Sequence, residues 1–228
     1  NYIQFNNELW RIIGIFNGQL KIIRNESLGE MVWQEYNDDE TNWHLSSLQT
    51  YLNNDYYNTI NENDKLRIDN YTWFLGDGGI YSTATAQSYY ENERNSSEAK
   101  WIGKIALIYP SDYGFSTSGG STINRNSCLT KGLYNWNSSS FSDCRNNSWL
   151  NKDDGYWTVI TTGESIPVTR APEISDYDYI FIVTGGGSVV LVGREKDFNY
   201  SVFPSLYLLS DVEIASGTGT SSNPYILK

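Results

Sequence analysis

The sequence contains few of the residues on which catalytic and metal sites commonly depend. Its 228 residues include one histidine, one methionine and two cysteines. The single histidine, His44, leaves one candidate for imidazole acid–base chemistry and cannot complete a zinc site with the two cysteines. Because His44 lies in an amphipathic segment, a helix-surface or capping role is the simpler interpretation. The nucleophile elbow Gly-x-Ser-x-Gly and the Walker loop are missing as well, so we expect no enzymatic activity.

Long hydrophobic runs and an excess of positive charge are also missing. No stretch approaches 18 consecutive apolar residues, so the sequence predicts no transmembrane helix. The 27 acidic residues outnumber the 16 basic ones and give a net charge of −11. This charge argues against nucleic acid as the main partner, because a phosphate backbone requires clustered Lys and Arg. The chain starts without methionine or a signal peptide, so we expect a processed or trimmed ectodomain.

The abundant residues suit turns, strands and contact surfaces. The chain has 18 tyrosines, 8 tryptophans and 19 glycines, together with many asparagines. This mixture is poor for long helices and typical of pleated surfaces and tight turns. A genome rich in A and T explains part of the asparagine excess, but it does not explain the tryptophans.

Both ends of the chain have the pattern of antiparallel strands. Three strands are expected over residues 2–5, 9–16 and 19–24, and Asn17-Gly18 is a strong hairpin signal between the last two. Gly185-Gly186-Gly187 lacks the following helix and the lysine of a phosphate loop, so it indicates a hairpin turn. Further strands are expected over residues 100–109, 156–160, 179–183, 188–192 and 206–209.

Helices are expected mainly after the first three strands. Apolar residues recur at helical spacing within residues 41–70, and a second short helix is expected over 61–68 with Leu66 and Ile68 facing inward. Residues 85–98 fit either a loop or a short helix. Strands and helices do not alternate, which disfavours a parallel doubly wound sheet. We therefore predict one α+β domain spanning residues 1–228. The first helical run is defined by Leu45, Leu48, Tyr51, Leu52 and Tyr56.

Residues 110–155, here named the disulfide segment, form the long irregular part of the sequence. They combine clusters of Ser, Asn and Gly with scattered aromatic residues and with both cysteines, Cys128 and Cys144. We expect a disulfide between these cysteines, which would stabilise the fold by about 3 kcal/mol in the chain-entropy picture. A disulfide in turn favours an oxidising compartment, and hence an extracellular or cell-surface location.

The apolar positions of the expected elements predict the core. Trp149 is expected to join it, together with Trp10, Trp43, Leu52, Trp101, Ile105, Leu107, Trp157, Phe181 and Leu208.

Three carboxylate clusters leave two alternatives open. Asp38-Asp39-Glu40, Asp153-Asp154 and Asp176-x-Asp178 could each hold calcium with nearby carbonyl groups, although none has the frame of an EF-hand. Two of these acids could also form the catalytic pair of a carbohydrate hydrolase, because spacing in sequence says little about separation in space. The simpler interpretation is a set of solvated surface turns, so we expect neither a cofactor nor a metal.

Four stretches of the sequence resemble a known family. They are Asn42-Trp43-x-x-Ser46-Ser47-Leu48-x-x-Tyr51-Leu52-Asn53-x-x-Tyr56-Tyr57, Trp10-Arg11-Ile12-Ile13-Gly14, Trp101-x-Gly103-Lys104-Ile105-Ala106-Leu107-x-Tyr109-Pro110-Ser111-Asp112-Tyr113-Gly114 and Gly217-Thr218-Gly219-Thr220-Ser221-Ser222-Asn223-Pro224-Tyr225. On these stretches the chain resembles C-type-lectin-like extracellular domains of pilin-like and other surface proteins of low-GC gut bacteria. The resemblance implies a fold related to variable proteins of diversity-generating retroelements and to formylglycine-generating enzymes, with adjacent N- and C-terminal strands.

The chain departs from this family at its late segment. Relatives usually have Gly-Val-Arg-Pro-Val-Val where this chain has Ser201-Val202-Phe203-Pro204-Ser205-Leu206, so the arginine is missing. The catalytic cysteine pair of the formylglycine-generating enzymes is absent, as are the calcium tripeptides Glu-Pro-Asn and Gln-Pro-Asp of true C-type lectins. Neither that activity nor that calcium site is therefore expected here.

The resemblance implies a displayed face between residues 158 and 204 that serves non-catalytic recognition or adhesion. Aromatic rings there would give flat apolar contact, and an arginine would bind carboxylates or amides. Expected partners are a protein receptor or a glycan on another cell or phage, or a pilus or self-assembly partner. A self-assembling structural subunit and a carbohydrate hydrolase are the alternatives. The expected contact residues are Tyr177, Tyr179, Arg194, Phe198, Asn199 and Tyr200, unless these merely decorate two hairpins.

Overall fold

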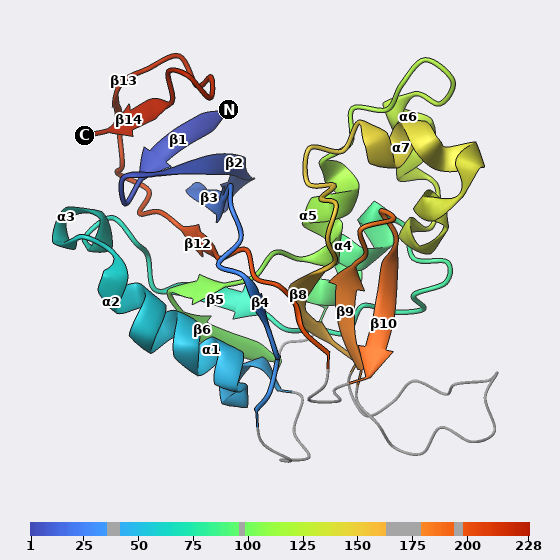
Figure 1. Ribbon diagram of the computed structural model, residues 1–228, viewed down its shortest axis with the longest axis horizontal. Coiled ribbons are helices and arrows are strands. Elements are labelled where there is room, and N and C mark those ends of the chain that lie inside the picture. The colour runs from blue at the N-terminus through green and yellow to red at the C-terminus, as the bar shows by residue number, and fades with distance from the viewer. Residues whose placement is uncertain (36–41, 96–98, 163–178, 194–197) are drawn as a thin grey trace.

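The computed structural model describes residues 1–35, 42–95, 99–162, 179–193 and 198–228. Within them, strands form a seven-stranded, a five-stranded and a two-stranded sheet, and short helices pack around these sheets (Figure 1). The protein is therefore mixed α+β, as the sequence predicts. Among the residues that the structure describes, no helix is both long and apolar enough to cross a membrane.

The N-terminal strands confirm the predicted meander. Strands β1 (Tyr2–Phe5), β2 (Glu8–Phe16) and β3 (Gln19–Arg24) pair in antiparallel order. Both hairpin turns place asparagine at positive φ, with Asn6 at 54°, Asn7 at 58° and Asn17 at 52°. Asparagine tolerates this left-handed region better than most residues. Its abundance in the sequence therefore has a structural use in these two turns.

The C-terminal strands complete the seven-stranded sheet. Strand β14 (Tyr225–Leu227) lies between β1 and β13 (Ile214–Ser216), and β12 (Ser205–Tyr207) lies between β3 and β7 (Ile105–Ala106). The two termini consequently lie at the same end of the molecule (Figure 1). The β1–β14 pair is parallel, whereas antiparallel strands were expected at both termini. No hairpin joins these two strands, so no turn imposes an antiparallel direction.

The first helical region is a chain of short turns rather than one helix. It contains η1 (Trp43–Leu45), α1 (Ser47–Tyr51), the π-helical turn η2 (Leu52–Tyr56) and α2 (Tyr57–Thr59), followed by α3 (Glu62–Lys65).

Two residues of this region were wrongly placed by the helical spacing. Leu45 is half exposed because the chain bends at Ser46, whose side chain caps α1 by accepting from Gln49 N at 3.0 Å. Leu66 is 77% exposed because α3 ends at Lys65, before the expected inward turn is complete. Ile68 is buried, as predicted, and bridges to Leu208.

The strand expected over residues 100–109 is split between two sheets. Strand β6 (Lys100–Gly103) pairs with β5 (Tyr71–Phe74), whereas β7 pairs with β12. Ile102 is consequently 62% exposed. Trp101, which was expected to be largely buried, is partly buried and packs against the core, with an edge contact to Trp43 at 6.0 Å between ring centroids.

The five-stranded sheet contains the later strands in the order β10-β9-β8-β11-β4. Its hairpin turn lies at the predicted three glycines, where Gly187 has a φ of 79° and the Gly187 N–H donates to the Thr184 carbonyl at 2.8 Å. The strands are β4 (Glu30–Met31), β8 (Tyr156–Thr161), β9 (Tyr179–Val183), β10 (Val189–Gly193) and β11 (Tyr200–Ser201).

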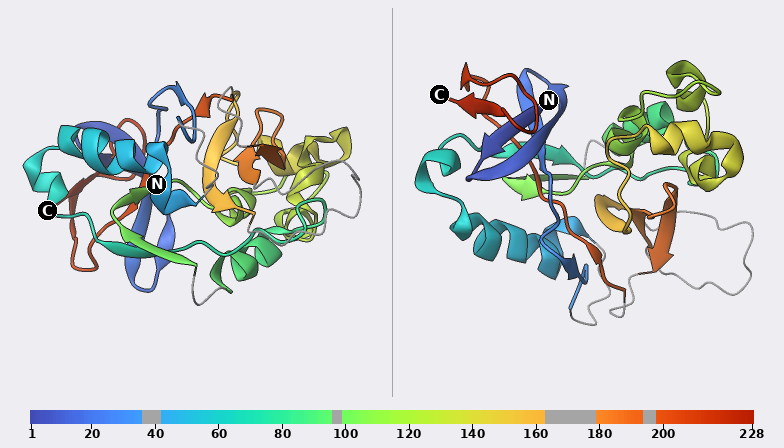
Figure 2. Two further views of the ribbon diagram at one scale, coloured as in Figure 1. Left: turned by 90° about the horizontal axis from the view of Figure 1, so that it is seen from below. Right: turned by 45° about the horizontal axis from the view of Figure 1, so that its top comes forward.

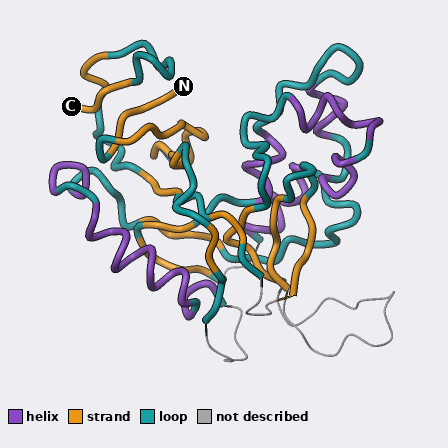
Figure 3. The backbone as a smooth tube through the Cα atoms, viewed as in Figure 1, coloured by secondary structure: helices purple, strands orange, loops and turns teal. Residues whose placement is uncertain are grey.

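The disulfide segment is more regular than the sequence predicts. It consists of α5 (Pro110–Phe115), α6 (Arg125–Leu129), η3 (Leu133–Asn137), η4 (Ser139–Phe141) and α7 (Ser142–Asn146). The predicted disulfide joins Cys128 of α6 to Cys144 of α7. Together with α4 (Ala86–Arg94), these helices gather at the end of the molecule away from the termini, as Figure 2 shows. Figure 3 shows strands between this group and the helical region that contains α1.

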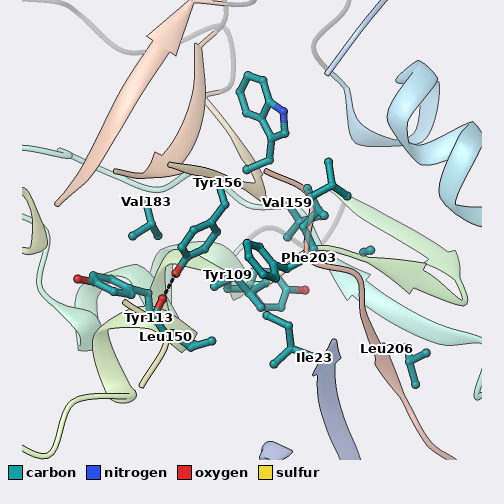
Figure 4. Packing of buried hydrophobic residues seen from close by; sticks show 14 of the residues in the cluster. Ile23, Tyr109, Tyr113, Leu150, Tyr156, Val159, Val183, Phe203 and Leu206 are labelled. Atoms are coloured by element: carbon teal, nitrogen blue, oxygen red, sulfur yellow. Dashed lines mark hydrogen bonds between the residues drawn. The ribbon is translucent and has the colours of Figure 1, made fainter. Parts of the chain in front are cut away.

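One continuous core joins the sheets. Eight of the nine residues predicted from strand and helix positions are buried, Trp101 being the exception, and Trp149 is only partly buried. Figure 4 shows Ile23 and Leu206 of the seven-stranded sheet and Val159 and Val183 of the five-stranded sheet around one aromatic cluster. The Tyr156 hydroxyl in this cluster donates to the Leu150 carbonyl at 2.8 Å (Figure 4). The core therefore extends from the sheets into the disulfide segment.

Candidate functional site

Four of the six predicted contact residues fall within the described residues. Tyr177 and Arg194 lie outside them. Phe198 is 40% exposed, Asn199 is exposed, and Tyr179 and Tyr200 are partly buried.

The structure brings three of these residues together and separates the fourth. Phe198 and Tyr200 stack with their ring centroids 6.4 Å apart, and Asn199 lies between them in sequence. Tyr200 lies next to the start of β8, because Ser201 pairs with Tyr156. Tyr179 lies beyond the other end of β8, where its N–H donates to Thr162 Oγ1 at 2.9 Å. A six-residue strand spans roughly 20 Å, so one compact site cannot contain all four residues.

The exposed Phe198 is the outer end of a row of packed rings. Tyr200 meets Trp157 edge-on at 4.7 Å, Trp157 meets Trp33 at 5.7 Å, and Trp33 meets Trp43 at 5.2 Å. Burial raises the pKa of Tyr200 above its ordinary value. Tyr200 is thus partly used for internal packing, and Phe198 and Asn199 are the exposed residues in the described part of the predicted face.

A better-formed site is a pocket of about 290 Å³ beside the disulfide segment. Six of its nine lining residues belong to that segment, and the others come from β2 and α4. The lining residues are Ile13, Phe16, Tyr90, Ser111, Asp112, Phe115, Ser116, Arg125 and Trp149.

The pocket wall is largely aromatic, and its rings are held in place. Tyr90 and Phe115 meet edge-on at 6.3 Å, and the Arg94 guanidinium lies 3.8 Å from the Tyr90 ring centroid. The Arg11 guanidinium lies 4.1 Å from the Trp149 ring centroid, and its Nη1 donates to the Trp149 carbonyl at 3.4 Å. Cation–π contacts of this kind fix ring orientation. The wall is therefore formed before any ligand arrives.

Arg125 is the exposed charged side chain of the pocket. Its Nε and Nη2 groups donate to the carbonyl oxygens of Thr117, at 3.0 Å, and Phe115, at 3.1 Å. Helix α6, which carries Arg125, is capped by Asn124 and tied to α7 through Cys128. These contacts restrict a long side chain that would otherwise lose considerable rotamer entropy on binding a ligand.

The inner end of the pocket covers a buried charged cluster. Lys21 Nζ lies 2.5 Å from Asp112 Oδ2, which also accepts the Tyr109 N–H at 2.8 Å. Glu93 accepts from the Ser111 N–H at 2.9 Å and from the Ser111 hydroxyl at 2.5 Å. The Lys21 and Glu93 side chains are fully buried, and that of Asp112 is 2% exposed. These carboxylates are therefore directed at internal partners rather than at the pocket.

A second, more polar pocket of about 250 Å³ lies beside the tip of the β2–β3 hairpin. The Asn17 amide there donates to the Tyr71 hydroxyl at 3.3 Å, and the Gln19 amide donates to Asp69. These four side chains of the pocket are thus already paired within the protein.

Metal-binding geometry is not seen in the described part of the chain. No group of three or more His, Cys, Asp or Glu side chains is arranged there to hold an ion. Asp153 and Asp154 belong to the described residues, whereas residues 38–40, Asp176 and Asp178 lie outside them.

Sequence reasoning missed both the pocket and the charged cluster. Phe115 and Trp149 were visible only as scattered aromatics, and no spacing relates them to Phe16 or Tyr90. Lys21 carried a weak signal, since a lysine between Leu20 and Ile22 is unusual in a buried strand. In the comparisons with known proteins, no family model, no curated protein and no solved structure matches this chain. The resemblance to lectin-like surface domains therefore stays a prediction.

Proposed function

We propose that this protein is a non-catalytic recognition domain that binds its ligand in the pocket of the disulfide segment. The observation that carries the proposal is a preformed aromatic wall next to a fixed, exposed arginine. Rings supply apolar contact at low entropic cost, and a guanidinium supplies paired donors. We propose this location as the main contact surface, with Phe198 and Asn199 as a second exposed patch.

The pocket favours a small ligand group that is partly apolar and carries an acceptor. Its volume of about 290 Å³ lies at the lower end of the range of small-molecule sites. Arg125 suits a carboxylate or amide oxygen, and the rings suit the flat face of a sugar or an aliphatic side chain. We therefore expect a glycan or a protein receptor that inserts one such group.

A C-type-lectin-like architecture and display at a bacterial surface are part of this proposal. The adjacent β1 and β14 strands agree with the terminal arrangement of that fold. The disulfide between Cys128 and Cys144 supports an oxidising, extracellular location. The resemblance to pilin-like proteins makes a pilus, or further copies of this chain, the expected setting of the domain.

The carbohydrate hydrolase is less well supported by the geometry. Glu93 and Asp112 are two acids that the fold places near each other, but each accepts hydrogen bonds from buried protein groups. A glycosidase acid pair must face the substrate from both sides of the scissile bond. The Glu93 and Asp112 side chains are too deeply buried to face a substrate in this way.

The test is a binding screen with a matched pair of variants. The purified chain is probed against a glycan array and against displayed bacterial and phage surface proteins. Arg125→Gln should weaken the strongest hit by at least about tenfold, as expected for an interface hot spot. Arg145→Gln is the control, because Arg145 also belongs to the disulfide segment and donates to the Asn137 carbonyl, yet it does not line the pocket. Equal binding by both variants would place the ligand elsewhere.

A further inference from the structure

Lys21 and Asp112 form a closely apposed, buried pair of an amine nucleophile and a potential acyl group. The two lie 91 positions apart in the chain, Lys21 on β3 and Asp112 in the first turn of α5. Lys21 Nζ lies 2.5 Å from Asp112 Oδ2, and the side chains are 0% and 2% exposed. The backbone fixes both partners, because Lys21 pairs with Tyr207 across β3 and β12, and Asp112 accepts the Tyr109 N–H.

The surroundings of the lysine amine are aromatic and exclude water. Lys21 Nζ lies 4.2 Å from the ring centroid of Tyr109, 5.1 Å from Trp73, 5.4 Å from Tyr207 and 5.8 Å from Phe16. Burial lowers the pKa of the Lys21 amine. A larger fraction of the amine is therefore uncharged and nucleophilic than in water.

A second buried acid lies beside this pair. Glu93 accepts both the N–H and the hydroxyl of Ser111, the residue next to Asp112. Burial raises the pKa of Glu93 to about 7, against the opposing charge of Arg94, whose Nη1 donates to Glu93 at 3.0 Å. The charges of Asp112, Arg94 and Glu93 all act on the Lys21 amine. Glu93 thus holds the start of α5, and with it the Asp112 carboxyl, in position against Lys21.

We propose that Lys21 and Asp112 condense within the folded protein to form an intramolecular amide bond. A proton passes from the Lys21 ammonium to the Asp112 carboxylate within the ion pair. The uncharged amine then attacks Cγ, a bond forms between Nζ and Cγ, and one Cγ–O bond breaks. The departing oxygen leaves as water with one hydrogen from the amine and one from the carboxyl hydroxyl. No oxidant, cofactor or second enzyme is needed, because the reaction is a dehydration between two groups of the chain.

The fold holds the two reacting groups in contact, whereas in water they would have to meet by diffusion. Fixed contact between two groups gives effective molarities of about 10⁵–10⁸ M in favourable cases. Full burial of the Lys21 amine opposes hydrolysis of the product, and the adjoining pocket, which Asp112 lines, gives the released water a way out. Glu93 is a positioning residue in this scheme, since it reaches Asp112 through Ser111. The inference does not rest on the binding proposal.

Intact mass measurement of the denatured and reduced full chain tests the bond. We expect a mass lower than the sequence mass by one water molecule, and tryptic peptides around Lys21 and Asp112 that remain joined after reduction. Lys21→Arg and Asp112→Ala should each have the full sequence mass. These variants also separate the bond from dehydration at Asp77-Gly78 or Asp154-Gly155, which would survive both substitutions.

Two results would overturn the proposal. One is a freshly folded and aged protein that keeps its full sequence mass, which would leave Lys21 and Asp112 as an ion pair only. The other is a water loss that persists in Lys21→Arg or maps to a different peptide. The mass and the peptide map are measured on the unaltered chain. The presence or absence of the bond can therefore be decided even if a variant fails to fold.

The role of Glu93 has its own readout. Glu93→Gln removes the acid but keeps an amide oxygen that can accept the hydrogen bond from Ser111. We therefore expect this variant to fold, with a thermal unfolding transition like that of the parent protein. In this variant, the lower-mass form should accumulate at least tenfold more slowly after purification. A plot of that rate against pH should also lose the step that titration of Glu93 near neutral pH produces in the parent protein. An unchanged rate and pH profile would exclude Glu93 from the reaction.

Discussion

The seven-stranded sheet and the disulfide segment are built on opposite principles. Within the sheet, the meander of β1, β2 and β3 has strands of four, nine and six residues joined by tight asparagine turns, so its order follows from local sequence. The helices α5, α6 and α7 of the segment have only five or six residues each. Helices this short are marginal by themselves. The segment is therefore ordered by contacts from outside its helices.

Those contacts are mostly from side chains to backbone. Thr117 Oγ1 donates to the Cys144 carbonyl at 2.6 Å, and Asp143 Oδ2 accepts the N–H groups of Thr122 and Ile123 at 2.6 and 3.0 Å. With the disulfide, they hold the loop that carries Arg125. The comparison shows that the sheet supplies a rigid framework, whereas the segment uses specific polar contacts to shape a pocket.

The largest expected effect is loss of a framework tryptophan. Trp10 is fully buried and meets Phe5 edge-on at 5.3 Å. Trp10→Ala should lower the free energy of unfolding by about 3–5 kcal/mol, measured by chemical denaturation. Trp101→Ala is the matched control and should cost clearly less, because its ring is only partly covered. Equal losses would mean that the two-stranded sheet belongs to the same framework.

A smaller and more local effect is expected from removing the disulfide. The double variant Cys128→Ala and Cys144→Ala should lower the free energy of unfolding by about 3 kcal/mol. Hydrogen exchange should then increase in α6 and α7 while β1–β3 keep their protection, because the crosslink closes only the segment. A uniform increase over sheet and segment would contradict the division between the two regions.

The framework was largely predictable from the sequence, for a physical reason. Alternation and the Asn17-Gly18 turn are local signals, so β1, β2 and β3 follow from neighbouring residues. The errors occur where tertiary contacts decide. Residues 100–109 change sheets after Gly103, and Trp101 is consequently left at a partly open position.

The candidate site was not predictable, because it combines residues from distant parts of the chain. Phe16, Tyr90, Phe115 and Trp149 meet only in the folded protein. The register between β2 and β3 shifts between Ile12 and Gly14, where Lys21 pairs with Gly14. The extra residue of this bulge is Ile13 of β2. Alternation alone would have placed Lys21 in solvent, but Lys21, Ile22 and Ile23 are all buried, so β3 is covered on both faces. The burial of Lys21 also depends on the rings of Trp73, Tyr109 and Tyr207, which come from distant parts of the chain.

Hydrogen exchange of the protein with and without the strongest ligand from the binding screen tests the central claim most directly. The account predicts that ligand protection is concentrated in residues 111–129 and around Trp149, with the amides of β1 and β14, which do not line the pocket, unchanged. Protection confined to residues 198–201, with none in the disulfide segment, would contradict the account. That result would return the binding face to Phe198, Asn199 and Tyr200.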